Sequence, residues 1–250
     1  MTMRNLSRTL FTAVLATALL AGCGKDEKAI EAELTINPKA FWGTERLIIG
    51  DTYADPFERP ILVQDLRCYL TGIYAINEND EALFISSVEH LDFSETPSIK
   101  KTLPTGRYKG LRFGIGVDAA RNTGQDPSQY PNAHPLSVVT SQGMFWTWNS
   151  GYIFVQFQGK TALDGDASNM LDSYAFHIGT DNLYREIEVA KAFEITENGA
   201  NIELAFLADR FLQSDEMVID LSISSVTHTM DNMVLATRFI DLFEQAIVIR

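Results

Sequence analysis

Hydrophobic and polar residues alternate along most of this chain, and this period of two is the feature that most limits its fold. In residues 31–36 the apolar positions are Ala32, Leu34 and Ile36, each separated by a polar residue. Successive side chains of a strand point to opposite faces, so such a segment buries one face and leaves the other in water. Similar segments recur between turn-forming residues, at 61–76, 82–87, 108–117, 152–158, 173–177, 186–195, 201–207 and 217–224. We therefore predict an all-β protein built as an antiparallel β-sandwich.

Two segments depart from this alternation. Residues 118–143 are rich in Asn, Gln, Pro, Ser and Gly and end just before Trp146 and Trp148. They predict a long loop, and loops of this length in compact domains are usually functional or disordered. Residues 231–246 place their apolar side chains at helical spacing, namely Leu235, Phe239, Leu242, Phe243 and Ala246. We expect a short C-terminal helix packed on the sandwich.

The N-terminus has the pattern of an export signal. Arg4 and Arg8 precede the apolar run 10–20, which leads to Leu-Ala-Gly and then Cys23. This run is too short for a membrane-spanning helix and has the flanks of a signal peptide. The ending resembles the bacterial lipobox, which implies that Cys23 becomes the lipid-modified first residue. An ordinary cleaved signal with an incidental cysteine is the alternative.

These features divide the chain into a lipoprotein signal peptide at 1–22, a lipidated tether at 23–30 and a sandwich domain at 31–250. Gly24 and Lys25, rather than an aspartate, follow the cysteine. By analogy with lipoprotein sorting, we expect an outer-membrane lipoprotein, held to the membrane by the lipid on Cys23 and facing the periplasm or the cell surface.

The charge of the chain excludes one class of partner. The formal net charge is −13, and the leader contributes only basic residues, so the mature protein is more acidic still. A strongly negative protein repels a phosphate backbone, which excludes nucleic acid. With Cys23 acylated, Cys68 is the remaining thiol, so no intrachain disulfide is expected, and its apolar neighbours predict a buried, inert side chain.

Any metal site must be assembled by the fold, because none of the four histidines has the spacing of a sequence-local metal motif. His134 lies in the predicted loop and His177 ends a predicted strand, so both are candidate ligands, although either is equally compatible with a surface or hydrogen-bonded role. His90 and His228 are assigned no ligand role. A nucleophile elbow, a helical zinc-protease motif and a hydrolytic triad are all lacking, so we do not expect an enzyme.

Three stretches together carry a family resemblance: residues 113–118 (FGIGVD), 143–154 (GMFWTWNSGYIF) and 176–179 (FHIG). They resemble the MbnP-like family, which groups the partner protein of methanobactin operons with surface copper proteins. The resemblance implies a β-sandwich that binds copper and is not an enzyme. It also implies that one tryptophan is oxidised to kynurenine by a partner, a dihaem cytochrome c peroxidase-like protein, and joins histidine nitrogens at the metal.

Carried over to this chain, the resemblance matches His177 best. It leaves Trp146 and Trp148 as alternatives for the modified residue, and His134 is offered as the second imidazole because it lies shortly before them. An intact indole is a poor ligand, whereas ring opening yields an aniline-type amine that coordinates. We expect an extracytoplasmic copper-binding lipoprotein involved in copper acquisition or handling. The alternative is a metal-free envelope β-sandwich that serves as a binding or structural module, in which the tryptophans are core residues.

Overall fold

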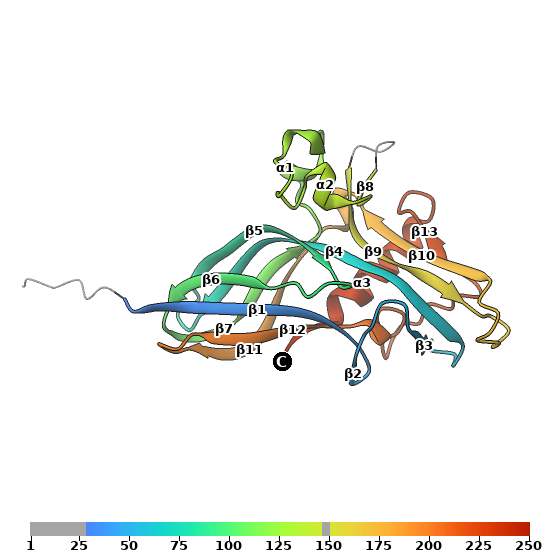
Figure 1. Ribbon diagram of the computed structural model, residues 1–250, viewed down its shortest axis with the longest axis horizontal. Coiled ribbons are helices and arrows are strands. Elements are labelled where there is room, and N and C mark those ends of the chain that lie inside the picture. The colour runs from blue at the N-terminus through green and yellow to red at the C-terminus, as the bar shows by residue number, and fades with distance from the viewer. Residues whose placement is uncertain (1–28, 147–150) are drawn as a thin grey trace, which may run out of the picture.

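The computed structural model describes residues 29–146 and 151–250 of the chain. The predicted signal peptide, Cys23, most of the tether and Trp148 lie outside the described residues. Within this part of the chain, 51% of residues lie in strands and 14% in helices, and two sheets pack into a sandwich (Figure 1). The predicted fold class is confirmed. None of the helices in this part has the length and hydrophobicity of a membrane-spanning segment.

The smaller sheet has the strand order β14-β12-β1-β2 among the described residues, and β6 also pairs with β1, along residues 31–36. The parallel pair in this sheet is β1–β12, in which Ile36 lies opposite Ile202. The strands are β1 (Glu31–Trp42), β2 (Glu45–Arg46), β6 (Ile99–Pro104), β12 (Ala200–Leu207) and β14 (Ile247–Ile249).

The larger sheet has the order β11-β7-β4-β9-β10-β13 in the described chain, with β3 and β5 paired to β4 and β8 paired to β9. The pairing of β10 with β13 is parallel, like that of β1 with β12. Both sheets are therefore mixed, whereas the sequence predicted antiparallel sheets. The strands are β3 (Thr52–Ala54), β4 (Pro60–Asn77), β5 (Ala82–Asp92), β7 (Gly106–Ile115), β8 (Phe145–Trp146), β9 (Gly151–Thr161), β10 (Asp172–Gly179), β11 (Arg185–Ile195) and β13 (Val226–Thr227).

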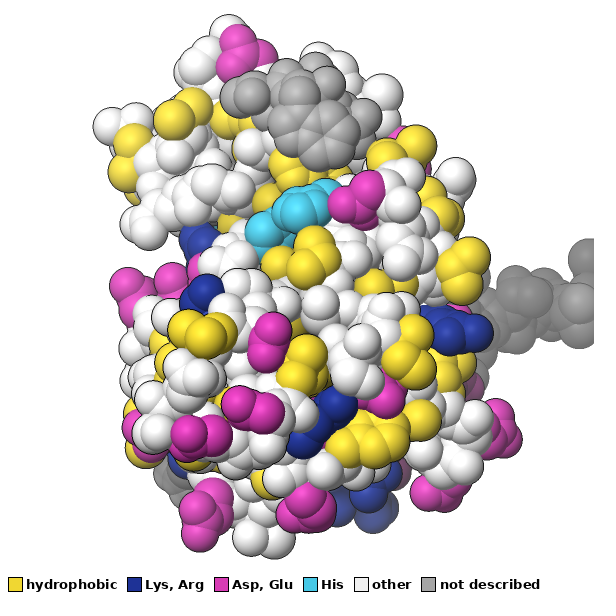
Figure 2. Space-filling view, turned by 90° about the vertical axis from the view of Figure 1, so that its right-hand side faces the viewer, with side chains coloured by type: hydrophobic (Ala, Val, Ile, Leu, Met, Phe, Trp, Pro, Cys, Tyr) yellow, Lys and Arg dark blue, Asp and Glu magenta, His cyan; other side chains and the backbone are white. Residues whose placement is uncertain are grey.

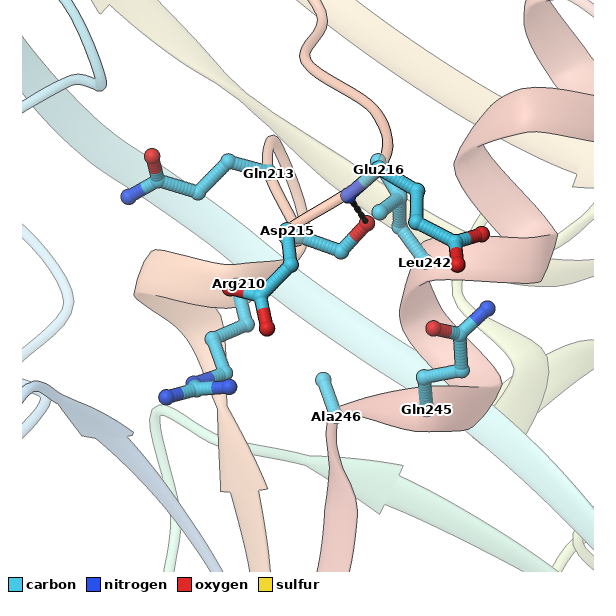
Figure 3. Close-up of a pocket in the computed structure, with 8 residues that line it drawn as sticks. Arg210, Gln213, Asp215, Glu216, Leu242, Gln245 and Ala246 are labelled. Atoms are coloured by element: carbon cyan, nitrogen blue, oxygen red, sulfur yellow. Dashed lines mark hydrogen bonds between the residues drawn. The ribbon is translucent and has the colours of Figure 1, made fainter.

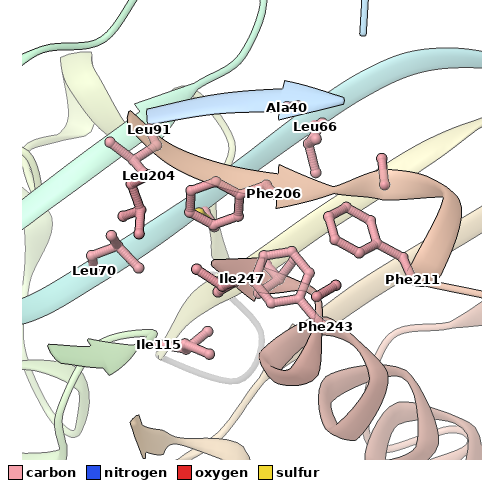
Figure 4. Close-up of a cluster of buried hydrophobic side chains, with 14 of the residues drawn as sticks. Ala40, Leu66, Leu70, Leu91, Ile115, Leu204, Phe206, Phe211, Phe243 and Ile247 are labelled. Carbon is pink, nitrogen blue, oxygen red and sulfur yellow. The ribbon is translucent and has the colours of Figure 1, made fainter. Parts of the chain in front are cut away.

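The main core lies between the two sheets and includes the C-terminal helix α3 (Met233–Gln245). Asn232 caps this helix by accepting a hydrogen bond from the Leu235 amide at 3.1 Å, which satisfies a free N–H of the first turn. Phe239 stacks on Phe176 of β10 with ring centroids 4.5 Å apart. Figure 4 shows part of this core, in which Phe206, Phe211 and Phe243 meet aliphatic side chains of both sheets. The predicted C-terminal helix is therefore present.

A second, smaller core lies on the outer face of the larger sheet. The predicted loop contains the short helices α1 (Ala119–Asn122), η1 (Pro127–Gln129) and α2 (Val138–Ser141). In Figure 1 this region lies above the larger sheet, on the side away from β1 and β12. Leu136, Met144 and Trp146 pack there on Tyr152 and Phe154 of β9. Strand β9 is consequently buried on both faces. The remaining short helices are η2 (Asp181–Leu183) and η3 (Ala208–Arg210).

One predicted strand, residues 217–224, is wrong. The alternation is real at its start, because Ile219 and Leu221 are buried, but Ile223 is 81% exposed. The Asp220 carboxylate accepts a hydrogen bond from the Ser222 amide at 2.9 Å, and the Asp220 carbonyl accepts from the Ile223 amide at 3.0 Å. These bonds turn the chain at Asp220, so the side-chain hydrogen bonding of an aspartate outcompeted strand pairing.

Candidate metal centre

Strand β10 presents His177 on the outer face of the larger sheet. Its neighbours Phe176 and Ile178 are fully buried in the main core, so the alternation of the strand directs His177 the other way. There it lies opposite Gln156 of β9. His177 Nε2 is 2.6 Å from Oε1 of Gln158, two residues further along β9 on the same face.

Strand β13 brings a second histidine beside the first. It runs parallel to β10, with Ala175 opposite Val226 and Phe176 opposite Thr227. The same register continued by one residue places His228 opposite His177. Their ring centroids are 4.9 Å apart and the rings are nearly perpendicular, at 82°. We call His177 and His228 the histidine pair. Figure 2 shows histidine side chains at the surface of the molecule, next to an acidic side chain.

Hydrogen bonds hold one nitrogen of each ring. His228 Nδ1 lies 3.0 Å from Asp231 Oδ2, while the other oxygen of Asp231 accepts from the His228 amide at 2.7 Å. The acceptor at His177 is the amide oxygen of Gln158, so Nε2 carries the proton and Nδ1 holds the free lone pair. In metal sites a histidine usually donates its second ring N–H to a carboxylate or carbonyl oxygen, which sets the tautomer. Both members of the pair have such a partner.

Burial keeps His177 neutral at physiological pH. Removal from water, and after it the neighbouring His228, lowers the pKa of His177 to about 4. The ordinary pKa of a histidine is about 6.5. Because a metal ion binds the lone pair of a neutral imidazole, this environment suits His177 for coordination.

Trp146 lies against the same stretch of β10. Its strand, β8, pairs with β9 so that Trp146 faces Gly151, and the indole is 6% exposed. The ring rests on Gly179, where a Cβ would overlap indole carbons Cζ3 and Cη2. Gly179 follows His177 by two residues, a rise of roughly 7 Å along a strand. The indole of Trp146 therefore packs on strand β10 two residues beyond His177, just past an irregularity in the β9–β10 pairing between Ile178 and Gly179.

The structure does not join His134 to this arrangement. Its ring stacks on Tyr130 with centroids 4.3 Å apart, and its Nδ1 accepts a hydrogen bond from the Leu136 amide at 3.1 Å. Within the described chain, no hydrogen bond or ring contact links His134 to His177. The structure thus brings His228 to His177 and packs Trp146 on Gly179, two residues further along β10. It leaves His134 in the loop, and Trp148 lies outside the described residues.

Sequence reasoning missed His228. Its one local signal is Asp231, which follows by three residues and supplies the carboxylate to its ring. The described residues contain no group of three or more His, Cys, Asp or Glu side chains that could hold a metal ion. The protein side of this site is therefore a pair of imidazoles beside an indole.

A pocket elsewhere in the described part of the chain lacks such chemistry. A pocket between η3 and the end of α3 is lined by Arg210, Gln213, Ser214, Asp215, Glu216, Leu242, Gln245 and Ala246 (Figure 3). Its lining holds neither a histidine nor a cysteine, and it shares no residue with the histidine pair.

The family motifs converge on the second core. Gly116, in the stretch 113–118, has φ +101° and a Cβ there would overlap the Phe154 ring; Gly179, in the stretch 176–179, seats Trp146. The model of the MbnP family matches residues 31–231, most of the chain. This chain belongs to the MbnP family. The resemblance seen in the sequence is therefore confirmed.

A solved structure, MbnP from Methylosinus trichosporium, is 14% identical to this chain with a TM-score of 0.47. The match covers 73% of this chain and 77% of that one. No curated protein matches the sequence. Membership in the MbnP family links the chain to methanobactin operons, whose MbnP proteins are accessory proteins and not enzymes.

Proposed function

We propose that this protein is an extracytoplasmic copper-binding lipoprotein that acquires or handles copper, and that His177 and His228 supply the imidazole ligands. The observation that carries the proposal is the histidine pair itself, with ring centroids 4.9 Å apart and one nitrogen of each ring held by an oxygen acceptor. Imidazole nitrogen is a ligand type that suits copper. The hydrogen bonds that the rings donate to Gln158 and Asp231 orient them in the way that partners of metal-bound histidines do.

Trp146 is proposed as the tryptophan that becomes a ligand. Two imidazoles alone leave coordination positions open, and the indole of Trp146 rests on Gly179 beside them. Conversion of tryptophan to kynurenine is an oxidation in which water supplies the oxygen atoms, the lost ring carbon leaves as formate, the electrons pass to the oxidant, and an aniline-type amine is freed. We propose a dihaem cytochrome c peroxidase-like partner as the oxidant. The buried position of Trp146 favours oxidation by electron transfer to that partner over direct contact with its haem.

The envelope location rests on the sequence of the leader. We propose that Cys23 is lipidated after removal of residues 1–22 and that the lipid anchors the domain to the outer membrane. Cys23→Ser should abolish incorporation of labelled fatty acid and release the protein from the membrane fraction. Retention in the membrane without the label would contradict the proposed anchor.

Copper binding tests the proposal directly. In a Cu(I) competition titration we expect His177→Ala and His228→Ala each to weaken binding by at least about 10-fold, the scale seen when metal-site residues are altered. His134→Ala is the matched control, because that ring contacts Tyr130 and Leu136 and not the pair. Equal loss in all three variants would point to a structural effect, and loss in His177→Ala and His134→Ala but not in His228→Ala would favour the site expected from the sequence.

Intact mass measures the tryptophan step. The protein produced together with the dihaem partner should carry the mass of kynurenine, and the Trp146→Phe variant should not. Modification that persists in Trp146→Phe and disappears in Trp148→Phe would assign the other tryptophan.

A metal-free binding module is the second candidate. It is favoured by one observation, that no group of three His, Cys, Asp or Glu side chains forms a metal site in the described residues. A wild-type protein with unmodified tryptophans that binds no copper at micromolar concentrations would establish it.

A further inference from the structure

Thr229 occupies a strained and buried position next to the histidine pair. Its φ is +68°, in the left-handed region, and its side chain is fully buried. Such a φ is a genuine outlier for a β-branched residue, and glycine or asparagine would adopt it more readily. Residues held in this way persist only when their surroundings require them, and they cluster at functional sites.

The hydroxyl of Thr229 takes the place of backbone hydrogen bonds between β13 and β10. Thr229 Oγ1 donates to the His177 carbonyl at 2.8 Å and accepts from the Gly179 amide at 2.9 Å. In a parallel pair that continued the register of β10 and β13, these two bonds would come from the backbone N–H and C=O of Thr229. The backbone has already turned away, because the Met230 amide bonds the His228 carbonyl at 2.8 Å.

The Thr229 hydroxyl therefore extends the pairing of β13 with β10 by one residue beyond the last pair that backbone hydrogen bonds hold. That residue is His228. On its other side, Asp231 holds both the amide and the ring of His228. We infer that Thr229 is a positioning residue that fixes His228 opposite His177, and that the left-handed strain is retained because glycine or asparagine at this position offers no hydroxyl. For its metal, this inference rests on the proposed function.

Thr180 offers a matched control within the same molecule. It is also a threonine with positive φ, +73°, and it follows Gly179 at the end of β10. Its hydroxyl is buried and has no hydrogen-bond partner among the described residues. The same substitution at the two positions therefore removes the same atom from residues with similar positive φ, but only at Thr229 does it break a bridge to β10.

The test compares Thr229→Val, Thr229→Gly, Thr229→Ser and Thr180→Val. In the metal-free protein, ¹⁵N spectra of the imidazoles should show the wild-type shifts of His177 and His228 in Thr229→Ser and Thr180→Val, and altered shifts in Thr229→Val and Thr229→Gly. Cu(I) affinity should fall about 10-fold or more in the latter two variants, as for other residues that orient metal ligands. Thr229→Gly relieves the backbone strain and so separates strain from loss of the hydroxyl.

Wild-type shifts and wild-type copper affinity in both Thr229→Val and Thr229→Gly would overturn the inference. The same is true if Thr180→Val disturbs the imidazoles as much as Thr229→Val. A wild-type protein that binds no copper but whose imidazole shifts still depend on the Thr229 hydroxyl would refute the proposed function and leave Thr229 as the residue that positions the pair.

Discussion

Replacing Gly179 with alanine should disrupt the packing of Trp146 on strand β10 and lower the stability of the fold. The added Cβ would overlap the distal indole carbons of Trp146 and would lie 2.7 Å from the carbonyl oxygen of Tyr152. Neither neighbour has room to retreat, because the indole is 6% exposed and the oxygen belongs to the backbone of β9. We expect Gly179→Ala to lower the free energy of unfolding by about 1–3 kcal/mol, the range for overpacking a core.

Urea unfolding followed by circular dichroism measures this loss. A double-mutant cycle with Trp146→Phe isolates the contact, since phenylalanine lacks the distal ring carbons that meet the new methyl group. In the Trp146→Phe background, the cost of Gly179→Ala should fall, with a coupling of about 0.5–3 kcal/mol. A cost that is identical in the two backgrounds, or below about 0.5 kcal/mol in the wild type, would refute the packing of Trp146 on Gly179.

Two further predictions concern stability away from this contact. The Asp55 carboxylate is fully buried and accepts hydrogen bonds from the Phe57 amide and from the Arg59 amide and guanidinium. Asp55→Ala should therefore lower the free energy of unfolding in urea by about 3–5 kcal/mol. A loss below about 1 kcal/mol would contradict a structural role for the Asp55–Arg59 ion pair. Burial lowers the pKa of His90 and of His177 to about 4. The unfolded chain then binds more protons than the folded protein between about pH 6.5 and 4, so the free energy of unfolding should fall as the pH falls through that window. His90→Phe should flatten this pH dependence in urea midpoints measured across the window, and an unchanged slope would count against a neutral, buried His90.

The alternation of the sequence was enough to predict most strands and the sandwich, because side chains of a half-buried strand must alternate between core and water whatever the partner strand is. It failed at Asp220, where the carboxylate accepts a short-range hydrogen bond from the Ser222 amide and the chain turns. It also carried no information on the parallel pairing of β1 with β12 and of β10 with β13, since a strand has the same period in either direction.

Part of the candidate site could likewise be predicted from the sequence, and part depended on the tertiary structure. The family resemblance carried by short motifs was sufficient to point to His177 and to leave Trp146 and Trp148 as alternatives, and the C-terminal helix α3 follows from its spacing. Only the tertiary structure paired His177 with His228, because the register between β10 and β13 is a contact between segments far apart in the chain, stabilised at its end by Thr229. Periodicity records which face of a strand is buried, whereas the neighbour across the sheet depends on how the whole chain packs.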